Sequence, residues 1–105
     1  MSQKLIEYYI HLRRLEIERE REVCGIILDN IYVARLLRQH IPAHKEKFES
    51  IIRLLESALD KNLQIIRILD SAIKNNFGHL DHSQSQKIRS LNNDILIIYN
   101  NVKIW

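Results

Sequence analysis

The residues of this chain that could bind a metal ion are mainly its five histidines. His40 and His44 are four residues apart, a spacing that places two ligands on one helix face, but Pro42 lies between them and interrupts a helix. Segment 79–82 holds two more histidines and an aspartate, without a third ligand at a fixed spacing. We therefore predict surface and capping roles for these histidines, with no metal site and no cofactor.

Two arginines precede two of these histidines. Four residues separate Arg35 from His40, and five separate Arg38 from His44. This spacing resembles that of HEPN domains, a family of helical-bundle ribonucleases that carry an arginine, four to six residues and then a histidine. The polar residue that usually follows the arginine is absent after Arg35, where Leu36 stands, whereas Gln39 follows Arg38. The resemblance implies an RNA site that acts without metal, and we keep it as an alternative.

The remaining polar patterns do not predict catalysis. Segment 16–22 alternates Glu with Arg, and interleaved charges of this kind are typical of a solvated helix face. The sequence contains no Ser-His-Asp arrangement, and two glycines are too few for a phosphate-binding or dinucleotide-binding loop. We predict no catalytic residues and no enzymatic activity.

The composition limits the class of protein further. A chain of 105 residues forms one domain at most, here 1–105, and its two Gly and one Pro leave little material for the turns of a β protein. Basic residues outnumber acidic ones by 16 to 13 but are spread along the chain, so nucleic acid is an unlikely partner. The single Cys24 suits a reducing compartment, and no apolar run is long enough to span a membrane. These features predict a cytoplasmic protein.

The elements that must position any site are three helices, expected at about 3–40, 43–77 and 84–105. Pro42 predicts a tight turn, and hence an antiparallel hairpin of the first two helices. Gly78 suits the left-handed position after a helix, and Ser83 with Gln86 fits a capping box at the start of the third. The fold class is therefore all-α, a three-helix bundle, in which the first helix runs straight, bends or splits near Gly25.

Apolar spacing assigns a buried seam to each helix. In the second helix the seam follows steps of three and four residues through Phe48, Ile52, Leu55, Leu59, Leu63, Ile66, Leu69 or Asp70, Ile73 and Phe77. In the third helix the seam includes Ile95, but several large apolar residues lie off it. A helix that is apolar on nearly every side must be covered on several sides.

The third helix is thus the predicted partner-binding element. If it folds back symmetrically along the second, segment 95–99 lies beside 63–68 and opposite the charged segment 16–22 of the first helix. We expect apolar surface to remain uncovered there. The predicted partner-binding residues are Ile95, Leu96, Ile97, Tyr99, Ile104 and Trp105.

One segment also resembles a known family. Segment 52–73, with Asn62 in its middle followed by Leu69 and Ala72, is similar to the second long helix of flagellar and type III secretion export chaperones. Those are small all-α proteins with an antiparallel hairpin and a further C-terminal helix. The resemblance implies a chaperone whose C-terminal helix binds the client protein.

The sequence therefore favours a non-enzymatic interaction protein, a chaperone, adaptor or assembly subunit, that binds a partner helix through its apolar C-terminal helix. No small-molecule substrate is evident. Two alternatives remain open: a structural homodimer that buries the third helix between two copies, and a nucleic-acid-binding or HEPN-like domain that uses Arg35, Arg38, His40 and His44.

Overall fold

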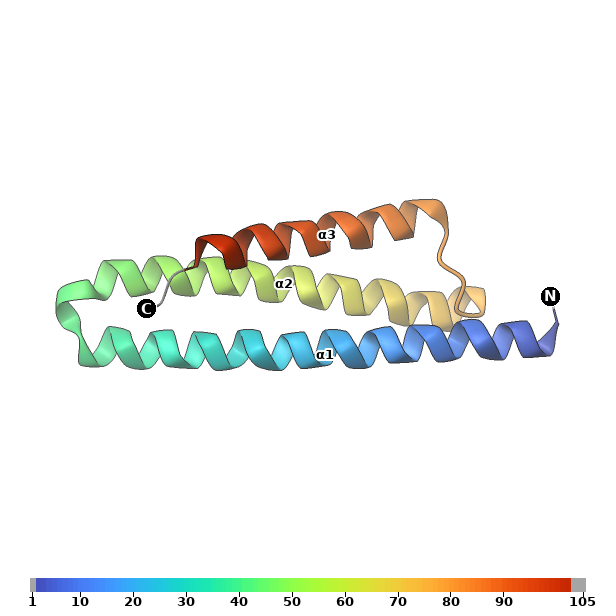
Figure 1. Cartoon of the computed structure of the whole chain (residues 1–105), viewed down its shortest axis with the longest axis horizontal. Coiled ribbons are helices and arrows are strands. Elements are labelled where there is room, and N and C mark those ends of the chain that lie inside the picture. The colour runs from blue at the N-terminus through green and yellow to red at the C-terminus, as the bar shows by residue number, and fades with distance from the viewer. Residues whose placement is uncertain (1, 103–105) are drawn as a thin grey trace.

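The computed structural model describes residues 2–102 and confirms the all-α, three-helix fold. Helix α1 spans Gln3–His40, the 3₁₀ turn η1 spans Pro42–His44, α2 spans Lys45–Asn76 and α3 spans His82–Asn101. The first two helices form a long antiparallel hairpin, and α3 returns along α2 (Figure 1). The bundle is 61 Å long and 20 × 18 Å in cross-section. No helix within residues 2–102 is long and apolar enough to cross a lipid bilayer.

Helix α1 is continuous through Gly25, so the alternative of a split first helix is wrong. The Ser2 side chain caps its first turn by accepting a hydrogen bond from the Leu5 amide at 3.2 Å. A Cβ on Gly25 would have no atom outside its own helix turn within 4 Å. The glycine therefore weakens the helix locally without allowing any close contact, and 38 residues of helix that pack on α2 outweigh that cost.

The predicted turn at Pro42 is confirmed. Ile41, placed before the proline, leaves helical geometry with φ −127° and ψ 74°, and its amide donates to Leu37 at 2.8 Å. Pro42 then opens the short 3₁₀ turn, so α2 itself begins at Lys45, two residues later than expected.

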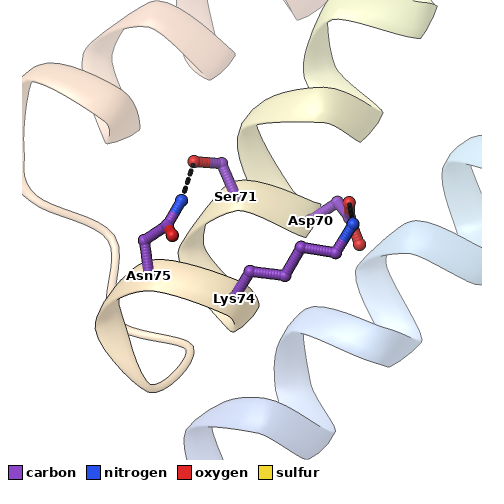
Figure 2. A network of polar contacts seen from close by, with 4 residues as sticks. All are labelled: Asp70, Ser71, Lys74 and Asn75. Atoms are coloured by element: carbon purple, nitrogen blue, oxygen red, sulfur yellow. Dashed lines mark hydrogen bonds and ion pairs between the residues drawn. The ribbon is translucent and has the colours of Figure 1, made fainter.

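The end of α2 combines exposed polar pairs with a tight backbone turn. Lys74 forms an ion pair with Asp70 at 2.8 Å, and Asn75 donates a hydrogen bond to the Ser71 hydroxyl at 3.1 Å. Figure 2 shows both contacts. The left-handed position predicted for Gly78 is confirmed (φ 82°), and Phe77 before it is also left-handed. The Gly78 amide closes the helix end by donating to the Ala72 carbonyl at 2.8 Å.

Helix α3 differs from the prediction at both ends. Asp81, not Ser83, is the N-cap: its carboxylate accepts from the Gln84 amide at 2.7 Å, and the Gln84 side chain accepts from the Asp81 amide at 3.0 Å. An aspartate caps at least as well as a serine, so the earlier capping box prevails. The helix ends at Asn101 and Val102 is extended, so the expectation that it continues through residue 102 is wrong, and residues 103–105 lie outside those described. Asn residues favour helix ends because their side chains compete for backbone bonds.

The core runs along the hairpin and is completed by α3. Its fully buried side chains include Ile27 and Ala34 of α1 and Leu55 and Ile65 of α2, and α3 adds Leu91 and Ile95. Within residues 2–102, α3 packs its backbone against α2 only, and none of its Cα atoms lies within 8 Å of one in α1. We call the side of the bundle between α1 and α3, where the two backbones do not approach each other closely, the open edge.

The predicted placement of α3 against α1 is wrong. Tyr99 accepts a hydrogen bond from Asn30 at 3.2 Å, so it lies ten residues beyond Glu20 along α1, and not opposite segment 16–22. The loop after α2 runs back along the bundle before α3 begins (Figure 1). Gly78 lies against α1, where a Cβ would come within 2.7 Å of the Ile10 nitrogen. The prediction assumed that α3 begins level with the end of α2. The loop instead places the start of α3 closer to the Pro42 end of the bundle.

Candidate functional site

The structure divides the predicted partner-binding residues into three groups. Ile95 is buried in the core, and Tyr99 is half-buried and bonded to Asn30. Leu96 and Ile97 are exposed. Ile104 and Trp105 lie outside the described residues. Of the described set, Leu96 and Ile97 are therefore the residues with most surface to offer.

Three large apolar residues of α1 are exposed at the same level of the bundle as these two. Ile26, Leu28 and Tyr32 lie within four residues of Asn30 on α1, and Leu96 and Ile97 lie within three of Tyr99 on α3. Because the Asn30–Tyr99 bond joins the two helices, all five side chains stand at one level of the bundle. Each is 49–63% exposed. We call Ile26, Leu28, Tyr32, Leu96 and Ile97 the apolar belt.

Two belt residues face the open edge between α1 and α3. Ile26 precedes Asn30 by four residues and so shares the α1 face that turns toward α3. Leu96 precedes Tyr99 by three and shares the α3 face that turns toward α1. Both side chains are nevertheless more than half exposed. The two helices thus present exposed apolar residues on either side of an edge that the Asn30–Tyr99 bond crosses.

The same edge deepens into a groove toward the loop that joins α2 to α3. The groove has a volume of about 290 Å³ and a mixed lining of apolar and polar side chains. Its apolar lining comes from Ile65, Leu69, Leu80 and Ile88, and its polar lining from Glu16, Arg19, Glu20, Ser85 and Asn92.

The most unusual polar contact lies beside this groove, between α1 and α2. Asn62 is fully buried, and its Nδ2 donates to Glu20 Oε2 at 2.9 Å and to the Glu20 carbonyl at 3.0 Å. Asn62 Oδ1 is also buried but has no hydrogen-bond partner among the described residues. An unsatisfied buried acceptor costs about 1–3 kcal/mol, so this pair weakens an otherwise apolar interface. Burial raises the pKa of the Glu20 carboxyl, and the bond from Asn62 opposes that shift.

The residues of the alternative RNA site are not gathered into one cleft. Arg35 and Arg38 line an open hollow with Tyr32 and Lys45, whereas His44 lines a different hollow formed by the turn at residues 42–47. His40 is exposed at the last position of α1. Within residues 2–102 no three His, Cys, Asp or Glu side chains converge as they would around a metal ion.

Sequence reasoning missed two parts of this picture. Leu63 was placed in the seam of α2, but Leu63 is 36% exposed and the neighbouring Asn62 is buried. A fully consistent signal was present, because Ala58, Asn62, Ile65, Leu69 and Ala72 follow steps of four and three and are all buried. The α1 part of the belt also had a signal, because Ile27, Ile31 and Ala34 follow seam spacing and are buried, and the belt residues of α1 lie off that spacing.

Comparisons of the chain with models of protein families, with curated proteins and with solved structures found no match.

Proposed function

We propose that this chain is a non-enzymatic helical interaction protein of the cytoplasm, a chaperone, adaptor or assembly subunit, that binds a helix of a partner protein along the open edge between α1 and α3. The observation that carries the proposal is the apolar belt. Of the seven large apolar side chains that are about half exposed or more within residues 2–102, five belong to it, and only Tyr8 and Phe77 lie elsewhere. Ile26 and Leu96 are the belt residues on the helix faces that carry the Asn30–Tyr99 bond, and exposed apolar residues near each other on a surface favour binding.

The geometry of the open edge favours a helix as the occupant. A helix laid between α1 and α3 would cover Ile26 and Leu96 together, since these residues face each other across the edge. Its continuation toward the α2–α3 loop would lie over the groove, where Ile88 and Leu80 offer further apolar surface. This is the helix-in-groove mode, in which residues at helical spacing fill apolar positions.

Within this class of function, the resemblance of segment 52–73 to export chaperones suggests a client protein as the partner. A second copy of the chain is the alternative occupant, as in a structural homodimer. A client protein and a second copy would bind at the same edge, so one set of variants tests both possibilities.

The test compares the intact chain with the double variant Ile26→Glu/Leu96→Glu. Wild-type chain, affinity-purified from the cells that produce it, is analysed by mass spectrometry for a stoichiometric partner, and the purified chain by sedimentation velocity for self-association. Charging both positions should weaken the association about tenfold or more while circular dichroism shows unchanged helicity.

Tyr8→Glu is the matched control, because Tyr8 is as exposed as Ile26 but lies far from the belt on α1. We expect it to bind like the wild type. A double variant that keeps the association, or a wild-type chain that is monomeric and holds no stoichiometric partner, would contradict the proposal.

The nucleic-acid alternative has one specific observation in its favour: Arg35, Arg38 and Lys45 surround one hollow together with Tyr32. Basic side chains beside an aromatic ring can hold a phosphate backbone and a stacked base. A salt-dependent shift of RNA that disappears with Arg35→Ala and Arg38→Ala would support this function. Absence of RNA binding at low salt would remove it.

A further inference from the structure

The contact between Glu20 and Asn62 lacks one hydrogen-bond donor, which Asn62 Oδ1 would need. Both Nδ2 hydrogens of Asn62 are donated to Glu20, one to the carboxylate and one to the main-chain carbonyl. The remaining polar atom of the side chain, Oδ1, is a buried acceptor without a donor. An ionised carboxylate cannot help it, because it accepts hydrogen bonds and has none to donate.

A protonated Glu20 has the donor that Asn62 Oδ1 lacks. The two oxygens of a carboxyl group are spaced like the nitrogen and oxygen of a primary amide, so an acid and an amide can pair through two hydrogen bonds. In that pair the Glu20 hydroxyl donates to Oδ1 while Nδ2 continues to donate to the other carboxyl oxygen. The existing contact of 2.9 Å already supplies the second of these bonds.

We propose that Glu20 and Asn62 form a proton-dependent clamp between α1 and α2, in which Glu20 takes up a proton from solvent and donates it in a hydrogen bond to Asn62 Oδ1. The groove gives the proton a route, because Glu20 lines it. The proposal concerns the hairpin alone and does not depend on what the apolar belt binds.

The charges around Glu20 allow this behaviour. On α1, Arg19 favours the ionised form and Glu16 opposes it, but Glu16 is also paired with Arg13 at 2.8 Å. On α2 the facing group is the neutral Asn62, and the α3 residues that line the groove, Ser85, Ile88 and Asn92, do not titrate. Among the described residues no Lys, Arg or His nitrogen lies within 4.0 Å of the Glu20 carboxylate.

The direction of the pH effect follows from burial. Because burial raises the pKa of Glu20 in the folded chain, this group's contribution to stability is fully present below the pKa of an unfolded glutamate. That contribution is lost as the pH rises through the higher pKa of the folded state. The clamp is therefore closed below the pKa of an ordinary glutamate and opens as the pH rises through the raised pKa of Glu20.

The test combines a titration of the intact chain with thermal unfolding of variants. NMR of the Glu20 side-chain carboxyl carbon should give a midpoint above that of an ordinary glutamate, and the Asn62 side-chain amide signals should shift with the same midpoint. Glu20→Gln supplies the missing donor at every pH. It should raise Tm at pH 7 by about 4 °C and remove most of the gain in Tm that the wild type shows on mild acidification.

Glu22→Gln makes the same chemical change at an exposed position of α1 and should leave the pH dependence intact. A Glu20 midpoint at or below the ordinary value would overturn the clamp, as would a Glu20→Gln variant less stable than the wild type at pH 7. If the variant does not fold, the same conclusion against the clamp follows. Unchanged Asn62 amide signals across the Glu20 titration would also overturn it.

Discussion

Helix α2 carries two sets of polar pairs that involve similar side chains and differ in their surroundings. Near its end, Asp70–Lys74 and Ser71–Asn75 are exposed and join neighbours four residues apart on the same helix (Figure 2). In its middle, Asn62 is fully buried and joins α2 to Glu20 of α1. Water competes for the hydrogen bonds of the exposed pairs, whereas the Asn62 side chain has no surface exposed to solvent. Burial, rather than the number of hydrogen bonds, decides how strongly a polar pair affects this fold.

The titrating groups show the same contrast. The bond to Asp70 raises the pKa of the Lys74 amine, which stays charged at neutral pH and remains in solvent. Burial raises the pKa of Glu20, and this shift opposes the charged form instead of supporting it. A rise in pKa thus supports the charged form in the exposed pair and the neutral form in the buried one.

The largest loss of stability is expected from Asn62→Asp. This change places a second carboxylate beside Glu20, in a buried position that has no cation, and should cost about 3–5 kcal/mol at pH 7. Part of the loss should be recovered at pH 4–5, where the two carboxyls share a proton. Thermal unfolding followed by circular dichroism at the two pH values measures both effects. Equal stability of variant and wild type at pH 7 would show that water reaches this position.

A smaller loss of stability is expected from Gly78→Ala. Gly78 lies at the same end of α2 as the exposed pairs. Gly78 is left-handed, and an added Cβ would come within 2.7 Å of the Ile10 nitrogen and the Tyr9 carbonyl carbon. Because backbone of α1 cannot move aside without disturbing its own helix, the variant should lose about 2–3 kcal/mol. Gly25→Ala is the matched control and should stabilise the chain, since its Cβ meets nothing. Equal effects of the two substitutions would contradict this account of the loop.

The smallest effect is expected from Asn75→Asp, the same chemical change as Asn62→Asp at an exposed position of the same helix. Its bond to Ser71 is open to solvent, so the change in unfolding free energy should be about 0.5 kcal/mol or less. Urea unfolding monitored by circular dichroism measures it. A loss of stability comparable to that of Asn62→Asp would show that burial does not determine how strongly an Asn→Asp change on α2 destabilises the fold.

Much of the fold could be predicted because it depends on local rules. The period of apolar residues identified three helices, Pro42 identified the turn, and Gly78 identified the left-handed residue after α2. The caps were less predictable, since Asp81 and Ser83 both lie at suitable spacing and only the fold shows which one is used. The site was predicted only in part. Leu96 and Ile97 are exposed as expected, whereas Ile95 is buried and Tyr99 bonds within the chain.

The sequence by itself determined that this chain is a bundle of three helices with a hairpin at Pro42, because helix period, turn residues and glycine conformations act over a few residues. The tertiary structure alone decided how far α3 slides along α2, since that depends on how the loop at Gly78 packs against α1. From this placement follow the level of Tyr99 opposite Asn30, the apolar belt and the open edge. Burial of Asn62 against Glu20 was likewise settled by packing between helices, because a one-residue rotation of α2 would have buried Leu63 instead.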